Sequence, residues 1–436
     1  MKKVLIITYY WPPSGGAGVQ RWLKFVKYLR EYGWEPVVFT AEGGEVPVID
    51  DSLKKDIPEN IEVIYGPIWE PYTAYKRLIG QKKGDKIQTG FLTENKKPKT
   101  TEKLSIWIRG NLFIPDARKF WIKPSVKSLS KYLKENNVDA IVSNGPPHTT
   151  HMIALSLKKK FDIPWLADFR DPWTNIDFYD KLLLSKWADK THHKLEDEVI
   201  NLADEVVTVS PNWAKDFLEQ SKRKFQVIYN GFDEEDFNNG TVELDKKFSF
   251  VHIGSMNKDR NPHNLWVVLG ELCREIEGFS EDVEIKMIGP VDIAVKQAIE
   301  SNGLIENFNK LNYVPHQEAI AILNTAQLLL LPINDTPNSL GVIPGKLFEY
   351  LAAKRPIICI GPTEGDSSKI IRESNAGYVF PFSDSENLKQ RIMSLFKEFK
   401  ENGSLGHSSG EINKYSRKNL TGQLAKLLDD LVSDKS

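Results

Sequence analysis

The sequence contains only two cysteines, Cys273 and Cys359, in 436 residues. They lie far apart and form neither a CxxC motif nor a Cys/His cluster, so they indicate reduced core thiols and exclude a disulfide framework. No apolar run approaches the roughly 18–20 residues that span a membrane. The formal charge of −1 gives no positive field to attract nucleic acid. We therefore expect a cytoplasmic protein with no nucleic-acid partner.

The N-terminus, Met1-Lys2-Lys3 followed by the apolar residues Val4 to Ile7, resembles a signal peptide at first glance. The apolar run is too short, and Thr8 to Pro13 follows it in place of a small-residue cleavage site. A buried first strand is the better interpretation.

Short apolar runs alternate with amphipathic segments along the chain. Val4 to Thr8 is typical of a strand, Gly18 to Tyr32 of a helix with one apolar stripe, and Pro36 to Phe39 of a second strand. The alternation starts again with the strand Phe248 to Ile253. Such repetition predicts mostly parallel sheets with helices on both faces. The expected fold class is α/β, with two doubly wound, Rossmann-like domains that face a cleft.

The turn cluster Tyr229 to Asp233 suits a connection between domains. We expect an N-terminal domain over residues 1–220 and a C-terminal domain over 221–410. The last helix, about Glu411 to Val432 within 411–436, is expected to pack back on the N-terminal domain. In open parallel sheets, ligands bind outside the carboxyl ends of the strands.

A basic segment interrupts the alternation of strands and helices. Residues 76–127 contain 14 Lys/Arg and 4 Asp/Glu, a net charge of +10, with four aromatic residues interleaved: Trp107, Phe113, Phe120 and Trp121. One interpretation is a polar insertion whose charges are solvated. The other is peripheral contact with an anionic membrane, where each basic residue contributes ~1 kcal/mol.

Gly15, Gly16 and Gly18 lie between the first strand and the first helix. Glycines let a ligand approach the backbone, and the N-terminus of a helix offers free N–H groups and partial positive charge to an anion. The segment lacks a full GxGxxG motif, so a tight turn without a ligand remains an alternative.

Two further segments in the second half carry polar residues suited to a nucleotide. After the strand that ends at Ile253, Lys258 and Arg260 precede a helix and can clamp a diphosphate, or else form a solvated basic loop. A Pro-Gly turn later opens a helix with Lys346 in its first turn and Glu349 one turn on. The helix start suits a phosphate, and the carboxylate can accept hydrogen bonds from a ribose diol or act only on the helix dipole.

Together these segments resemble the retaining family 4 glycosyltransferases of the GT-B fold, and among them bacterial enzymes that build cell-surface polysaccharides. The motifs that carry the resemblance are the Gly-rich loop, Ala167 to Trp173, Val209-Ser210, Asn230 to Asp233 and Pro344 to Pro356. The resemblance implies a nucleoside-diphosphate sugar as donor, hexosyl or N-acetylhexosaminyl, and a glycan or lipid-linked acceptor. It also implies that domain 1–220 is the acceptor side and that domain 221–410 binds the nucleotide sugar.

The resemblance also assigns donor residues. The family's ribose-binding glutamate matches Glu349, whereas its partner eight positions earlier falls on Gly341, which leaves the donor sugar open. Backbone N–H groups of Gly341 and Val342 would face the distal phosphate. The first position of the family's basic pair is Ser255, and Arg260 matches the second.

On the acceptor side, Arg170 fills the place of a histidine that many relatives carry. Asp171 is expected either to orient or deprotonate the acceptor hydroxyl, or to pair with Arg170. His148 and His151 are the nearest histidines, and each either lines the cleft or is a helix-start or core residue. Gly15 is placed on this side and Gly16 at the donor.

The expected catalysis is electrostatic, because the leaving nucleoside diphosphate gains negative charge. We assign the catalytic roles to Arg260, Lys346, Asp171 and His148, with retention of anomeric configuration after the two halves close. The chain has no Asp-x-Asp motif, so neither a metal nor a cofactor is expected. A sugar-nucleotide epimerase of the same fold and a non-catalytic binder remain the alternatives.

Overall fold

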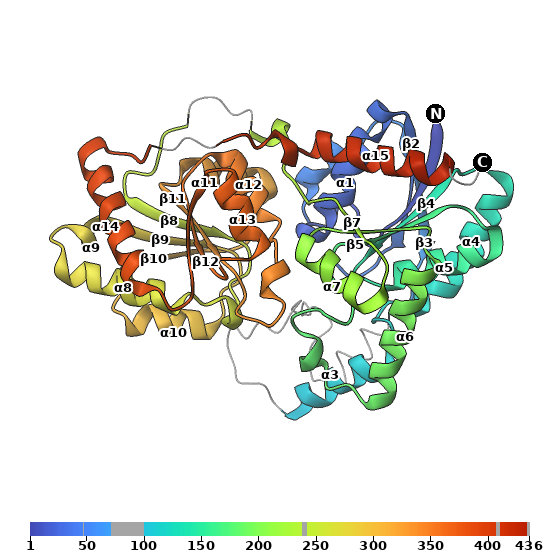
Figure 1. Ribbon diagram of the computed structural model, residues 1–436, viewed down its shortest axis with the longest axis horizontal. Helices are drawn as coiled ribbons and strands as arrows, with labels where there is room; N and C mark the ends of the chain where they lie inside the picture. The colour runs from blue at the N-terminus through green and yellow to red at the C-terminus, as the bar shows by residue number, and fades with distance from the viewer. Residues whose placement is uncertain (47, 71–99, 238–241, 407–409, 434–436) are drawn as a thin grey trace. The chain divides into compact units, whose positions relative to one another are not determined.

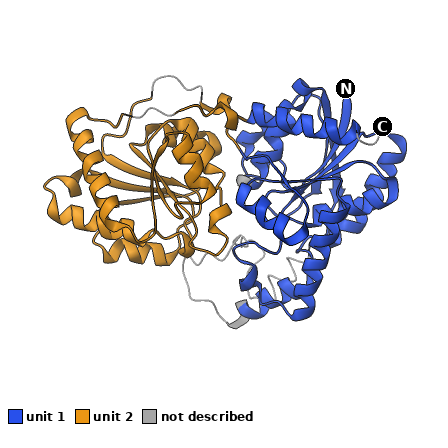
Figure 2. Ribbon diagram, in the orientation of Figure 1, with its two compact units in different colours: residues 1–87, 98–230, 417–436 blue, residues 88–97, 231–416 orange. Residues whose placement is uncertain are grey.

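The computed structural model describes residues 1–46, 48–70, 100–237, 242–406 and 410–433. The described chain forms two compact units, each built on its own sheet (Figure 2). Unit 1 comprises 1–46, 48–70, 100–230 and 417–433, and unit 2 comprises 231–237, 242–406 and 410–416. The predicted class, α/β with two doubly wound parallel-sheet domains, is confirmed.

Unit 1 contains a seven-stranded sheet in the order β3-β2-β1-β4-β5-β6-β7, and every pair is parallel (Figure 1). The strands are β1 Lys2–Ile7, β2 Trp34–Glu42, β3 Glu62–Pro67, β4 Ala140–Gly145, β5 Trp165–Phe169, β6 Glu205–Thr208 and β7 Gln226–Val227. The helices are α1 Ala17–Leu29, α3 Thr100–Leu112, α4 Ile122–Glu135, α5 Thr149–Phe161, α6 Lys186–Leu202, α7 Pro211–Ser221 and α15 Arg417–Ser433.

Helices cover both faces of this sheet because successive strand residues point to opposite sides. Val4 and Ile6 of β1 pack in one cluster with apolar residues of α1 and α15, and Leu5 and Ile7 pack in another with residues of α4 to α7. Figure 1 shows α15 lying along α1. Both faces of the sheet are therefore buried, as near-continuous apolar strands require.

Unit 2 contains a six-stranded sheet in the order β10-β9-β8-β11-β12-β13, again parallel throughout. Its strands are β8 Phe248–Ile253, β9 Val283–Ile288, β10 Phe308–Leu311, β11 Leu328–Pro332, β12 Ile357–Ile360 and β13 Gly377–Phe380. Its helices are α8 His263–Glu275, α9 Phe279–Asp282, α10 Ile293–Ser301, α11 His316–Thr325, α12 Lys346–Ala353, α13 Asp366–Glu373 and α14 Ser385–Asn402.

Two boundaries differ from those expected. Strand β7 pairs with β6, so the first sheet continues past residue 220, and the units divide between Asn230 and Gly231. The last helix begins at Arg417 and not near residue 411, because Asn413–Tyr415 forms a 3₁₀ turn and Phe232 bridges Ser416 within unit 2. Helix α15 itself belongs to unit 1, where it contacts α1.

A buried ion pair ties three segments of unit 1 together. Arg21 Nε of α1 lies 2.7 Å from Asp168 Oδ2 of β5, and both side chains are almost fully buried. The indole N–H of Trp22 donates to the same carboxylate, and Arg21 Nη1 donates to the carbonyls of Ile228 and Tyr229. The pair thus fixes α1 to β5 and to the end of the first unit.

We predict that Asp168→Ala lowers the free energy of unfolding by about 3–5 kcal/mol, because it leaves the Arg21 charge buried without its partner. Asp51→Ala is the matched control, since its ion pair with Lys54 is exposed and the expected loss is below about 1 kcal/mol. Urea unfolding measures both. Equal, small losses would show that the buried pair does not hold unit 1 together.

Candidate functional site

In unit 2, the loop that follows β8 approaches the start of α12. Gly254 adopts φ +101°, and a Cβ atom there would lie 3.0 Å from Lys346 Nζ. The positive φ and the close approach both favour glycine. The first turn of α12 is thereby brought to the carboxyl end of β8, where open α/β sheets bind their ligands.

Lys346 lies half-buried at this edge, with its Nζ 3.1 Å from Nε2 of His252. Burial, followed by the charge of Arg260, lowers the pKa of Lys346 well below its ordinary value, and Glu349 opposes the shift. Two neighbouring cations in a poorly hydrated place favour the binding of an anion. A diphosphate is such an anion.

Arg260 is fixed at the same edge by two neighbours. Its Nε donates to Asn334 Oδ1 at 2.9 Å, and its Nη1 donates to the carbonyl of Ser255 at 3.0 Å. Asn334 follows β11 and is buried. The guanidinium is therefore oriented by the ends of two adjacent strands, whereas Lys258 in the same loop is exposed.

The loop before α12 differs in one respect from the expectation. The amides of Gly341 and Val342 donate to the carbonyls of Asn338 and Ser339 inside the 3₁₀ turn Ser339–Gly341, so a phosphate would have to compete for them. A Cβ atom added at Gly345 would meet nothing within 4 Å, so the space beside the residue that caps α12 is open. The amides of Leu347 and Phe348 donate to the carbonyls of Pro344 and Gly345, so a phosphate at the start of the helix would have open space but would compete for these two amides as well.

Glu349 is one-quarter exposed and belongs to the first turn of α12. Its Oε1 lies 3.8 Å from Nδ1 of His316, whose Nε2 lies 3.2 Å from Asp236. The carboxylate can still accept hydrogen bonds at its exposed side. The structure thus brings Ser255, Arg260, Lys346 and Glu349 to one edge of unit 2.

The predicted Gly-rich residues of unit 1 lie at the start of α1. The Gly15 amide donates to the Val48 carbonyl, and Gly16 caps α1 with φ +92°. A Cβ atom at Gly18 would lie 3.1 Å from Arg170 Nη1, so the Arg170 side chain covers this turn. The positive φ of Gly16 favours glycine there whether or not a ligand binds.

Arg170 and Asp171 form the ion pair that was one of the two expectations, with Nη2 and Oδ2 3.0 Å apart. Arg170 Nη1 is buried and has no hydrogen-bond partner among the described residues. Asp171, whose side chain is about one-third exposed, is thus paired with Arg170, as the structural alternative expected.

His148 and His151 are both buried, and the second is fully so. His151 Nδ1 lies 2.7 Å from Ser143 Oγ, and burial lowers its pKa to about 3. His148 stacks on Trp173 with ring centroids 4.4 Å apart, and burial lowers its pKa well below the ordinary value. The core interpretation therefore fits His151, and an acceptor contact through its ring would need rearrangement.

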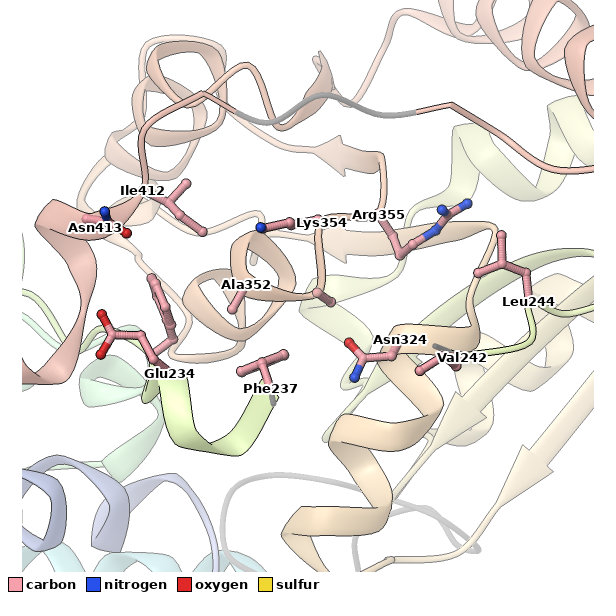
Figure 3. A pocket seen from close by; sticks show the side chains of 12 residues that line it. Glu234, Phe237, Val242, Leu244, Asn324, Ala352, Lys354, Arg355, Ile412 and Asn413 are labelled. Atoms are coloured by element: carbon pink, nitrogen blue, oxygen red, sulfur yellow. The ribbon is translucent and has the colours of Figure 1, made fainter. Parts of the chain in front are cut away.

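A cavity of about 470 Å³ lies at the other end of α12 (Figure 3). Its lining includes Ala352, Lys354 and Arg355 from the C-terminal end of the helix and Glu234 and Phe237 from the segment after the domain connection. The C-terminus of a helix carries partial negative charge and disfavours a phosphate. The N-terminal end of α12 therefore suits a diphosphate better than this cavity does.

Sequence reasoning missed His252 and Asn334, the two buried residues that orient the cations. A usable signal existed for the first: a histidine in a mostly apolar strand, two positions before the glycine. Nothing in the local sequence distinguished Asn334 from an ordinary loop asparagine.

Two adjoining family models match the chain. The one described as Glycosyltransferase Family 4 matches residues 87–236, and the one described as Glycosyl transferases group 1 matches residues 233–409. Together with the two parallel-sheet units, these matches identify the chain as a glycosyltransferase of the GT-B fold. No curated protein sequence matches it.

Solved structures with this fold include sucrose-phosphate synthase from Thermosynechococcus elongatus, at 14% identity over 100% of both chains and a TM-score of 0.62. WaaG, a glycosyltransferase involved in lipopolysaccharide biosynthesis, matches at 12% over 99% of this chain and 98% of its own, with a TM-score of 0.53. A variant of S. aureus TarM, in complex with fondaparinux, alpha-GlcNAc-glycerol and UDP, matches at 12% over 100% and 99%, with a TM-score of 0.57. At these identities the likeness establishes the fold alone.

We predict that Arg260→Ala weakens the binding of a nucleoside diphosphate by about 2 kcal/mol, roughly thirtyfold in Kd, because a charged hydrogen bond is lost. Lys258→Ala is the control in the same loop, and its exposed side chain should contribute less than about 1 kcal/mol. Isothermal titration calorimetry compares the two. Equal effects would remove Arg260 from the site.

Proposed function

We propose that this glycosyltransferase moves a hexosyl or N-acetylhexosaminyl group from a nucleoside-diphosphate sugar to a glycan or lipid-linked acceptor, with retention, in cell-surface polysaccharide biosynthesis. One observation carries the donor part: Arg260 and Lys346 meet at the carboxyl ends of β8 and β11 beside the start of α12. The UDP in the TarM complex supports the donor part, and the involvement of WaaG in lipopolysaccharide biosynthesis supports the pathway part.

In this proposal the donor diphosphate lies against Arg260, Lys346 and the open start of α12. Both cations stabilise the negative charge that develops as the glycosidic bond to the diphosphate breaks. Because they supply positive charge themselves, we propose that neither a metal ion nor a cofactor takes part. The described residues contain no group of three His, Cys, Asp or Glu that could hold a metal.

Glu349 is proposed to bind the ribose, because its exposed carboxylate follows Lys346 by one turn on the same helix face. Gly341 has no side chain that could contact the sugar, so other groups must recognise the donor sugar. Ser255, whose carbonyl already holds Arg260, and Val342 complete the proposed donor set with Gly16.

The acceptor role of unit 1 stays a proposal that rests on Arg170, Asp171, His148 and Gly15. Arg170 is supported by its buried Nη1, which, like Nδ1 of His148, has no hydrogen-bond partner among the described residues. A hydroxyl or an anionic group of the acceptor would satisfy it.

We further propose peripheral contact of unit 1 with an anionic membrane on the cytoplasmic side. Residues 76–99 of the basic segment lie outside the described residues. Trp107 of α3, in the described part of the segment, is 42% exposed. Trp187 of α6 lies outside the segment and is 66% exposed. Asn111 of α3 accepts a hydrogen bond from the Ser185 amide and so joins α3 to the start of α6. Trp121, in contrast, is core. None of the helices described is long and apolar enough to cross a membrane.

Turnover tests the proposed reaction. Purified protein is incubated with α-linked UDP, GDP, ADP and dTDP sugars, with and without glycan or lipid-linked acceptors, in EDTA. We expect acceptor-dependent release of one nucleoside diphosphate and an α-linked product by NMR. Conversion of the sugar nucleotide without acceptor would indicate an epimerase, and tight nucleotide binding without turnover would indicate a binding protein.

Flotation with vesicles tests the membrane contact. We expect the protein to bind vesicles that contain anionic lipid and to detach at high salt, since screening weakens attraction between charges. The double variant Trp107→Glu/Trp187→Glu should reduce binding at least tenfold, whereas Val267→Glu, an exposed residue of unit 2, should not. Equal binding to neutral vesicles, or no effect of the double variant, contradicts the proposal.

A further inference from the structure

His252 lies inside unit 2, next to the last residue of β8, and its side chain is fully buried. The other residues of this strand are Phe248, Ser249, Phe250, Val251 and Ile253. An imidazole removed from water costs free energy unless both ring nitrogens find partners. Both do, and the partners determine which nitrogen carries the proton.

His252 Nδ1 lies 3.0 Å from the carbonyl oxygen of Leu330 in β11. A carbonyl oxygen only accepts, so Nδ1 carries the hydrogen and Nε2 presents a lone pair. Burial, and then the charge of Lys346, lower the pKa of His252 well below its ordinary value, which keeps the ring neutral. The histidine is thus a fixed acceptor and not a second cation.

The Nε2 atom lies 3.1 Å from Lys346 Nζ. A lysine ammonium has only donors, so one of its three N–H groups points at His252 and two remain for a ligand. A free lysine side chain samples many rotamers, and one already held in place loses less conformational entropy on binding.

Tyr350 supports the same arrangement from α12. Its hydroxyl accepts from the Ile253 amide at 3.1 Å and lies 3.4 Å from the Leu330 carbonyl. Lys346 and Tyr350 are four residues apart and therefore share a helix face. Lys346 and Tyr350, one helical turn apart, thus both attach α12 to the sheet: Lys346 contacts β8, and Tyr350 contacts β8 and β11.

We propose that His252 is a positioning residue, whose Nε2 holds the Lys346 ammonium where the donor diphosphate binds. This proposal rests on the proposed donor site. The charged or titratable groups that face Lys346 are His252 from β8, Arg260 from the loop after it, and Glu349 and Tyr350 from α12. Nothing else in the proposed mechanism requires a buried histidine at this place.

The arrangement has a pH signature. In the free site, burial and Arg260 lower the pKa of Lys346, and a bound diphosphate opposes both influences. Binding therefore takes up a proton above the lowered pKa, and affinity falls as pH rises. Loss of the His252 acceptor disfavours the charged lysine further, so the fall in affinity should move to lower pH.

The test is a double-mutant cycle on His252 and Lys346, with inorganic pyrophosphate and UDP as probes and calorimetry at several pH values. We expect His252→Phe to weaken both probes about tenfold and to shift the pH profile downward. His252→Gln, whose amide oxygen can accept from Lys346, should restore most of the affinity. In a Lys346→Met background, His252→Phe should have little further effect.

Gln327→Leu is the matched control, because Gln327 is a fully buried polar residue just before the start of β11. It should lower stability without moving the pH profile. Equal losses from His252→Phe with and without Lys346, or failure of His252→Gln to rescue a folded protein, would overturn the positioning role. If the wild-type protein binds neither pyrophosphate nor any nucleoside diphosphate, the proposed donor site fails instead.

Discussion

Every strand pair in both sheets is parallel, and this constraint determines where chemistry can occur. Parallel strands need helical crossovers, so helices cover both faces of each sheet. The carboxyl ends of all the strands lie at the same edge. At that edge of unit 2, β8 and β11 end beside the start of α12. Arg260, Lys346 and the residues that contact them therefore lie together at this edge, beside the start of α12.

Holding two cations together without a ligand is electrostatically unfavourable, and the surrounding residues manage this in different ways. Arg260 is oriented by neutral oxygens of Ser255 and Asn334, whereas Lys346 donates to a neutral histidine and has a lowered pKa. Such an edge is preorganised for a diphosphate, since little reorganisation remains when the anion arrives. The repulsion between Arg260 and Lys346 is strongest when no anion is bound.

The sequence alone predicted the fold class and many of the elements, because apolar periodicity and turn glycines act locally. The donor residues that it assigned on motifs stay predictions. It did not predict the partners that act across the sheet. His252 meets Leu330 and Lys346 only after β8, β11 and α12 come together, and Arg170 meets Gly18 only when β5 lies near α1. The last helix was placed too early because residues 411–416 pack in unit 2, which composition could not reveal.

Hydrogen–deuterium exchange with a bound nucleoside diphosphate tests the central claim most directly, namely that unit 2 holds the donor diphosphate between the loop after β8 and the start of α12. The account predicts slower exchange in peptides that cover 254–261 and 341–349, with little change around the cavity near Lys354 and Arg355. Protection confined to that cavity or to unit 1, with the two site peptides unchanged, would contradict it.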